Sequence, residues 1–331
     1  MLTSYHYKSS NSYQSGFTLI ELMISLVLGL IISAAVIQVY LINVKTSTIQ
    51  ASASDLQDAS VFGLQQLERK VRLANLGNPS TQINSTTVNG GVVLTDANIG
   101  INAAPFINSD YLTRRAGDTT KNGTNGWTGI SNTNTNSDQL TIQYINITGV
   151  PMTDCEGAVV AVNDIVIERY FLRQAIGYTS NGAIKDLVLA CDAGRVNTAG
   201  GIATVTPSSD PRNFGQAGQE FIVNVDQFKV LLGTQATSAA NAGQMSYLPS
   251  NAYLTIAAAD QPAITAIKLG IIVHGSTPVL GSDDQSSFTL LGQSNVLKAD
   301  TSRKKQVRNT YETTTLLRNA RVVNISTSLQ P

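Results

Sequence analysis

The fold of this chain is decided by residues 16–23, which read Gly-Phe-Thr-Leu-Ile-Glu-Leu-Met. Glu21 is the only Asp, Glu, Lys or Arg between Lys8 and Lys45. The uncharged run that follows, residues 22–44, is long enough for a helix to cross a hydrocarbon core of about 30 Å at about 1.5 Å per residue. A carboxylate in such a segment is expensive, so it is a functional hypothesis by default. The alternative is a charge that reaches water at the membrane surface.

The helix is predicted to continue beyond the apolar run and to become amphipathic. We expect it to end at Leu76, with Gly77 as the C-terminal cap and Pro79 just beyond. The residues that recur at three- and four-residue spacing form one stripe, and they are Leu56, Ser60, Leu64, Leu67, Val71 and Ala74. The segment therefore predicts one helix, membrane-spanning in its first part and amphipathic in its second.

The rest of the chain has the composition of a β-rich domain. Charged residues make up only 13% of the sequence, and the formal net charge is +0 at pH 7. Alternating or β-branched runs bounded by turn residues predict strands, and they lie at 139–145, 159–162, 165–171, 187–190, 221–225, 228–232 and 266–273. We therefore predict an α+β protein, in which a long N-terminal α-helix precedes a β-rich globular headgroup with mainly antiparallel sheet.

The N-terminal pattern resembles that of type IV prepilins and pseudopilins. In those proteins a short polar leader ends in Gly, and Phe and a Thr-Leu-Ile-Glu run follow, as at Gly16, Phe17 and residues 18–21 here. The resemblance implies cleavage between Gly16 and Phe17 by a prepilin peptidase and N-methylation of Phe17. It also implies an assembly role for Glu21, which would pair with the methylated amine of a neighbouring subunit. The apolar helix is kept after cleavage, unlike that of an ordinary secretory signal.

Later segments resemble the PilW-type minor pilins. They lie, in the expected order, at residues 137–144, 154–157, 168–171, 187–191, 225–233 and 311–319. The resemblance implies a leader at 1–16, a transmembrane and assembly helix at 17–78, and a periplasmic β-rich headgroup at 79–331. A weak composition signal suggests two lobes split near 215–220.

The resemblance also implies a function and a location. The expected protein is a minor pilin of a type IV pilus, which helps to initiate pilus assembly with other minor pilins. It would sit at the pilus tip and support twitching motility, adhesion or DNA uptake. Its partners would be other minor and major pilins, the prepilin peptidase and the inner-membrane assembly platform. It would be a single-pass inner-membrane protein with a periplasmic C-terminal domain, later incorporated into the pilus.

Cys155 and Cys191 are the only cysteines. An exported domain faces an oxidising compartment, which favours a disulfide between them. Two buried free thiols are the alternative. Metal ligation is disfavoured because there is no Cys-x-x-Cys pair and no nearby histidine. We expect neither a metal nor a cofactor.

An enzyme is not expected, because the common nucleophile, zinc and phosphate-loop motifs do not occur. His274 lies in an apolar run, and a strand histidine satisfied by its neighbours is the simplest interpretation. Residues 303–305 together with Arg308 form a basic cluster. It is either a solvated loop or a contact for nucleic acid or an acidic partner, so nucleic-acid binding is weakly supported. Two alternatives stay open: a J-type minor pseudopilin of type II secretion, and a pilus-displayed DNA receptor or adhesin.

Overall fold

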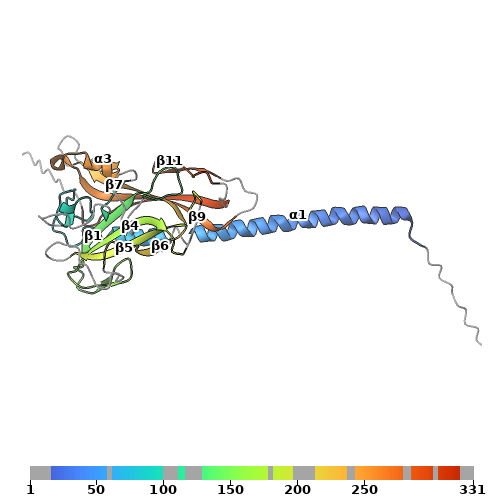
Figure 1. The fold of residues 1–331 in the computed structure, drawn as a ribbon, viewed down its shortest axis with the longest axis horizontal. Coiled ribbons are helices and arrows are strands. Elements are labelled where there is room, and N and C mark those ends of the chain that lie inside the picture. Colours follow the sequence, from blue (N-terminus) through green and yellow to red (C-terminus); the bar gives the residue numbers. More distant parts are fainter. Residues whose placement is uncertain are drawn as a thin grey trace, which may run out of the picture. The chain divides into compact units, whose positions relative to one another are not determined.

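The computed structural model describes residues 16–57, 62–99, 111–115, 129–177, 182–196, 213–236, 243–278, 285–300 and 305–320. The chain divides into two units, residues 1–48 and 49–331. A long apolar helix comes first, and antiparallel sheets follow it (Figure 1). The predicted α+β class is therefore confirmed.

The first helix, α1 (Leu19–Gln57), has 39 residues. Its most apolar stretch has a mean hydropathy of 2.6, and none of that stretch is buried, so the helix is long and apolar enough to cross a membrane. The last turns of α1 belong to the second unit. There Leu56 is buried in the core, and the Ser52 hydroxyl donates to the carbonyl of Thr277 at 2.9 Å.

The second helix, α2 (Gly63–Val71), buries Leu64, Leu67 and Val71. Residues 58–61 lie outside the described residues, so the predicted unbroken helix is described as α1 and α2. The predicted end at Leu76 is wrong, because residues 72–77 form turns. Asn75 has a φ of +67°, and its N–H donates to the carbonyl of Gln143 at 3.1 Å. The chain therefore leaves the helix to bond to a strand.

The first sheet has the strand order β1-β4-β5-β6, and all its pairs are antiparallel. Its strands are β1 (Gln139–Ile145), β4 (Ile165–Gln174), β5 (Leu187–Val196) and β6 (Gln219–Ile222). The strand predicted at 139–145 is confirmed. Strand β5 is longer than predicted because its polar residues are buried in ion pairs. A small hairpin, β2 (Met152–Thr153) and β3 (Val159–Val160), lies between β1 and β4 in the sequence.

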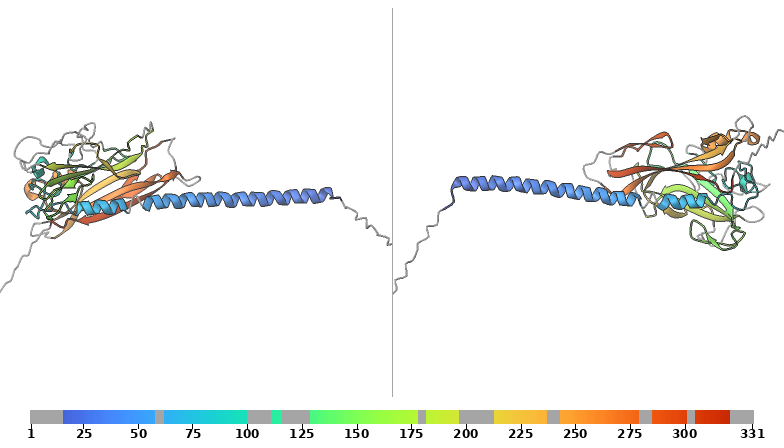
Figure 2. Two further views of the ribbon diagram at one scale, coloured as in Figure 1. Left: turned by 90° about the horizontal axis from the view of Figure 1, so that it is seen from below. Right: turned by 180° about the vertical axis from the view of Figure 1, so that it is seen from behind.

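The second sheet has the strand order β12-β9-β7-β8. Its strands are β12 (Gln306–Leu316), β9 (Ala263–Pro278), β7 (Val225–Gln235) and β8 (Met245–Leu248). A separate hairpin joins β10 (Ser287–Leu290) and β11 (Gln293–Val296). The short helices are α3 (Ser250–Leu254) and the 3-10 helices η2 (Asp96–Ile99) and η4 (Ala258–Asp260). Figure 2 shows both sheets from two further directions.

The strand predicted at 221–225 is wrong, because the chain changes sheet there. Strand β6 ends at Ile222, and β7 begins at Val225 in the other sheet. Between them Asn224 has a φ of +57°, and its carbonyl accepts the His274 N–H at 3.0 Å. Asparagine tolerates this left-handed conformation better than most residues.

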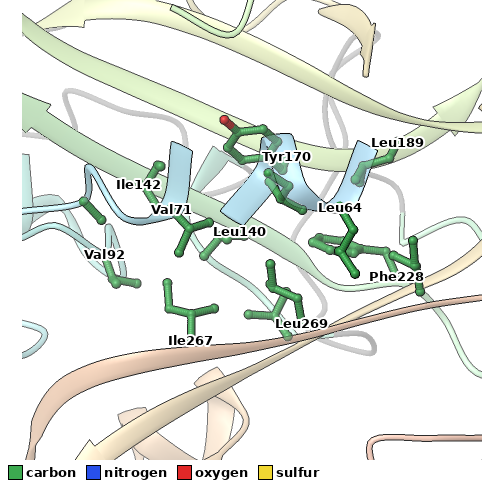
Figure 3. Close-up of a cluster of buried hydrophobic side chains, with 14 of the residues drawn as sticks. Leu64, Val71, Val92, Leu140, Ile142, Tyr170, Leu189, Phe228, Ile267 and Leu269 are labelled. Atoms are coloured by element: carbon green, nitrogen blue, oxygen red, sulfur yellow. The ribbon is translucent and has the colours of Figure 1, made fainter. Parts of the chain in front are cut away.

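One hydrophobic core joins α2 and the two four-stranded sheets. In Figure 3, Leu64 and Val71 of α2 lie between Tyr170 and Leu189 on one side and Ile267 and Leu269 on the other. Helix α2 therefore fills the space between the sheets. The division into leader, helix and headgroup, and a split near 215–220, stay predictions.

Candidate processing and assembly site

The N-terminal candidate residues lie at the start of α1. Gly16 and Phe17 precede the helix, and the Phe17 side chain is 90% exposed. Helix α1 begins at Leu19, which makes Thr18 the N-cap residue and places Glu21 in the first turn. The expected cleavage position is therefore an exposed segment that ends where the apolar helix starts.

Thr18 and Glu21 form a reciprocal capping box. The Glu21 carboxylate Oε2 accepts the Thr18 N–H at 3.0 Å and the Thr18 hydroxyl at 2.9 Å. The Glu21 N–H in turn donates to the Thr18 hydroxyl at 3.3 Å. This arrangement satisfies N–H groups that a helix start leaves without partners. The Glu21 carboxylate therefore has hydrogen-bond donors within its own chain.

The second candidate pair joins two segments of the headgroup. Cys155 lies in the turn between β2 and β3, Cys191 lies in β5, and the two form a disulfide with a Cα–Cα distance of 6.1 Å. The same turn is organised by Asp154, whose Oδ1 accepts the N–H groups of Glu156 and Ala158 at 3.0 and 2.8 Å. The disulfide and this turn hold the connection between β2 and β3 against the first sheet.

Glu168 lies beside the disulfide and is fully buried. Its Oε1 accepts the Tyr144 hydroxyl at 2.9 Å and the Cys155 N–H at 3.0 Å, and its Oε2 accepts the Tyr170 hydroxyl at 2.6 Å. The Lys70 ammonium of α2 lies 3.5 Å from Oε1. Burial, and then the neighbouring carboxylate, raises the pKa of the Tyr170 hydroxyl well above its ordinary value. Both tyrosines therefore stay protonated donors, and Glu168 ties α2 to the sheet.

Two acidic residues of this turn, Asp154 and Glu156, also contact strand β5. The Arg195 guanidinium donates to Asp154 Oδ2 at 2.9 Å. Glu156 Oε2 accepts the Ala193 N–H at 3.0 Å, and burial, aided by the charges of Asp192 and Asp154, raises the pKa of Glu156 to about 8. Most Glu156 carboxyls are therefore protonated in neutral solution.

Arg169 is fully buried, and the sequence gives little sign that it would be. Its guanidinium bonds to Asp192 at 2.8 and 3.0 Å, and it donates to the carbonyl of Gln216 at 2.6 Å. Its central carbon lies 4.0 Å from the Phe171 ring centre and 4.4 Å from that of Tyr111. A guanidinium between aromatic faces is favourable because of the negative charge on those faces. This residue fastens β4 to β5.

Residues 225–233 contribute a buried polar cluster to the second sheet, as Arg169 and Asp192 do in the first sheet. Asp226 is buried, accepts the Arg308 guanidinium at 2.8 Å and accepts the Asn132 amide at 2.6 Å. His274 Nε2 lies 3.8 Å from the same carboxylate. His274 is thus a buried strand residue that lies beside other polar groups.

The predicted basic cluster is therefore wrong in one member. Arg308 is buried against Asp226, because β12 carries it into the sheet, and it adds no charge to an exposed patch. Lys305 is exposed, while residues 303–304 lie outside the described part of the chain.

Asn75 is a structural residue that sequence reasoning missed. It is fully buried, and its amide donates to the carbonyls of Ser80 and Asn319 at 2.7 Å each. Its side-chain oxygen accepts the Gly91 N–H at 3.1 Å. The sequence feature that could have pointed to Asn75 is its position just before Leu76 and Gly77, where the helix was predicted to end. Asn75 ties the end of the helical region to the turn that follows β12.

Metal chemistry has one geometric candidate among the described residues. The ligand atoms of Cys155, Glu168 and Cys191 lie within 4.8 Å of one another. Both sulfurs are in the disulfide, so neither is the thiolate that would bind a metal. These residues therefore link the turn between β2 and β3 to the first sheet through a disulfide and a hydrogen bond.

Two protein-family models match segments of this chain. The prokaryotic N-terminal methylation motif matches residues 11–37, and the family described as Type IV Pilus-assembly protein W matches residues 203–319, which include β6 to β12. A type IV-like pilin from Thermus thermophilus aligns with a TM-score of 0.36 and 12% identity, over 80% of this chain and 98% of that chain. That likeness is too low to add to the assignment. No curated protein matches the chain. The methylation motif at the start of α1 and the PilW match over most of the second sheet together support a type IV prepilin-like protein, a minor pilin of the PilW type.

Proposed function

We propose that this minor pilin helps to initiate type IV pilus assembly with other minor pilins and takes a place at the pilus tip. The observation that carries the proposal is the position of Glu21, a lone carboxylate in the first turn of an apolar helix, directly after an exposed Gly16-Phe17 pair. A membrane-embedded carboxylate of this kind needs a partner.

The proposed mechanism begins with cleavage between Gly16 and Phe17 by the prepilin peptidase. Cleavage leaves a new amine on Phe17, which the same enzyme methylates. Before assembly, the Glu21 carboxylate accepts two hydrogen bonds from Thr18. On assembly it would pair with the methylated amine of a neighbouring subunit. An ion pair in a low-dielectric environment is directional, and removing one partner is costly, so the pair sets the axial register of the subunits.

The location follows from the same helix. We propose a single-pass inner-membrane protein whose headgroup, residues 79–331, is periplasmic until the subunit enters the pilus. Helix α1 supplies the anchor and, through its apolar surface, the contacts with neighbouring pilin helices. The headgroup, with its disulfide and buried ion pairs, supplies a rigid body for contacts with other subunits. We expect this role to be structural, without catalysis.

Two observations bear on the alternatives. The match to the Type IV Pilus-assembly protein W family favours a pilus over a J-type pseudopilin of type II secretion. The burial of Arg308 weakens the basic cluster on which a DNA receptor would depend. Adhesion and DNA uptake would then be effects of assembling the pilus.

The test exchanges the charge of Glu21 without changing its size. We expect Glu21→Gln to be inserted and cleaved normally but to lower surface pili and twitching, because the amide cannot form the ion pair. Thr18→Ala is the matched control, since it removes the two hydroxyl hydrogen bonds of the capping box and keeps the Glu21 carboxylate. Pili are counted by shearing and immunoblotting, with type II secretion scored in the same strains. Normal piliation and twitching with Glu21→Gln would contradict the proposal.

Blocking the processing step gives a second arm. We expect Gly16→Leu to retain the leader, which mass spectrometry of the full chain detects, and to lower surface pili as well. Full piliation by an uncleaved subunit would show that the amine of Phe17 is not needed.

A further inference from the structure

Strand β12 is an edge of the second sheet, and its pairing shows which residues face outward. Leu317 N–H donates to the carbonyl of Thr265 at 2.9 Å, in register with the ladder to β9. Because N–H and C=O groups alternate sides along a strand, the odd-numbered residues of this part of β12 bond to β9. The even-numbered residues therefore direct their backbone groups away from the sheet, and they are Thr310, Glu312, Thr314 and Leu316.

Most of this outer edge has no backbone partner. The Thr310 N–H is taken by the side chain of Asn309, at 2.9 Å. Within the described residues, no backbone hydrogen bond is made on the outer side of Glu312, Thr314 or Leu316. The three side chains are exposed, and that of Leu316 is 61% exposed. A row of unpaired N–H and C=O groups is a template for another strand.

The other described edges are closed or short. The outer side of β1 is covered by bridges from Val92 to Ile142 and from Arg114 to Gln139. Strands β6 and β8 have 4 residues each, whereas β12 has 11. Residues 309–316 contain no proline and no lysine, the residues that usually protect an edge. The edge of β12 is therefore long and lacks the usual protection.

The charges along this edge are already balanced. Glu312 pairs with Lys268 at 3.1 Å, and its carboxylate also accepts the Leu291 N–H. What remains is backbone, two threonines and the apolar Leu316. These groups match an extended polypeptide with uncharged side chains, and they do not match a polyanion such as nucleic acid.

We propose that the β12 edge, from Thr310 to Leu316, receives an extended strand of another pilin-like subunit, which adds to the second sheet. The inference rests on the proposed assembly function, because that function supplies the neighbouring subunit. A second copy of this chain is a poorer occupant. Antiparallel self-pairing over the full length of the edge is centred on Thr313 and sets Leu316 opposite Thr310, whose N–H is already bonded to Asn309. A different subunit can pair along the open part of the edge without this loss.

Site-specific photocrosslinking tests the contact in cells that carry the full chain as their only copy. The photoreactive residue p-benzoylphenylalanine replaces Leu316 at the edge or, as the control, Ile176, which is 76% exposed in the turn after β4. We expect a Leu316 adduct with another pilin-like subunit, mapped by mass spectrometry to an extended segment, and no such adduct at Ile176. In piliated cells, an adduct with only a second copy of this chain, or no adduct at Leu316, would overturn the proposal.

A proline substitution tests the hydrogen bonds themselves. Thr314→Pro removes an outward N–H and leaves the ladder to β9 complete, and proline is tolerated on edge strands. Thr314→Val keeps the N–H and is the matched control. We expect the proline variant to lower the Leu316 adduct about tenfold, with an unchanged melting temperature, because strand addition depends on these bonds. An undiminished adduct would overturn the inference.

The outcomes also separate the two proposals. If Glu21→Gln abolishes pili while Thr314→Pro leaves the adduct unchanged, the assembly function stands and the edge contact is rejected. If Glu21→Gln leaves piliation normal, the assembly mechanism is rejected, and the crosslink alone then decides whether the edge receives a strand.

Discussion

Replacing Glu168 should lower the free energy of unfolding of the headgroup through the loss of a few identified hydrogen bonds. Its buried carboxylate accepts hydrogen bonds from Tyr144, Tyr170 and the Cys155 N–H, and Lys70 lies 3.5 Å away. In Glu168→Gln one of the two oxygens becomes an NH2 group that donates. At least one of the present donors then loses its acceptor, and the remaining bonds lose their ionic character.

The expected magnitude follows from these bonds. A hydrogen bond to a charged group contributes about 1.5–3 kcal/mol, and a neutral one contributes about 0.5–1.5 kcal/mol. Weakening two bonds and leaving one donor unsatisfied lowers the free energy of unfolding by about 3 kcal/mol. Glu220→Gln is the matched control, because the ion pair of Glu220 with Arg173 is partly exposed and such pairs contribute about 0–1 kcal/mol.

Urea unfolding of the full chain in detergent micelles, followed by circular dichroism of the sheet signal, measures the difference. With a slope of about 3 kcal/mol per molar urea, the midpoint of Glu168→Gln should fall by about 1 M. The Glu220→Gln midpoint should stay close to that of the parent protein. A Glu168→Gln midpoint no lower than that of Glu220→Gln, with equal slopes, would refute the reasoning.

Three further predictions concern the same headgroup. Replacing Cys155 and Cys191 together by serine should lower the free energy of unfolding by up to about 4 kcal/mol, since the disulfide closes a loop with a sequence separation of 36. Urea titrations of the parent protein with and without a reducing agent should show the same difference in the free energy of unfolding. The pKa of Glu156 in the folded protein is raised to about 8, so its contribution to the free energy of unfolding is fully present below the unfolded pKa near 4.5 and is lost as the pH rises toward 8. Glu156→Gln should flatten this decline in urea titrations at several pH values. An unchanged pH profile would exclude Glu156 as the cause of the decline. Leu67→Ala should destabilise the fold by about 2–5 kcal/mol because Leu67 is fully buried, whereas Val159→Ala, at a side chain 65% exposed, should change the melting temperature little; equal shifts would contradict the core assignment.

Periodicity predicted some elements well and others badly, for a physical reason. The strand at 139–145 alternates regularly and was predicted to the residue. Strand β5 was predicted only to residue 190, because the apolar run ends there and the charged Asp192 and Arg195 follow. They lie in a sheet because Arg169 and Asp154 supply opposite charges from other segments. Sequence patterns report local preference, while buried ion pairs depend on residues that are distant along the chain.

The candidate sites divide in the same way. Gly16, Phe17 and Glu21 are adjacent in the sequence, so a local pattern was enough to propose them. The disulfide between Cys155 and Cys191 was proposed from the cysteine count and the expected compartment. Nothing local could show that Glu168 lies beside it, or that Arg308 turns into the sheet to meet Asp226.

The sequence by itself determined the candidate anchor: an uncharged run with one carboxylate near its start forms a helix long and apolar enough to cross a membrane, because the bilayer requires a segment that satisfies its own backbone. It also determined the β-rich class of the remainder, since alternating side chains suit a half-buried sheet. Only the tertiary structure decided where α2 ends, where the chain changes sheet, which charges are buried together and which edge of the second sheet lacks a backbone partner among the described residues. Each of these depends on contacts between distant segments, which form only when the sheets pack around α2.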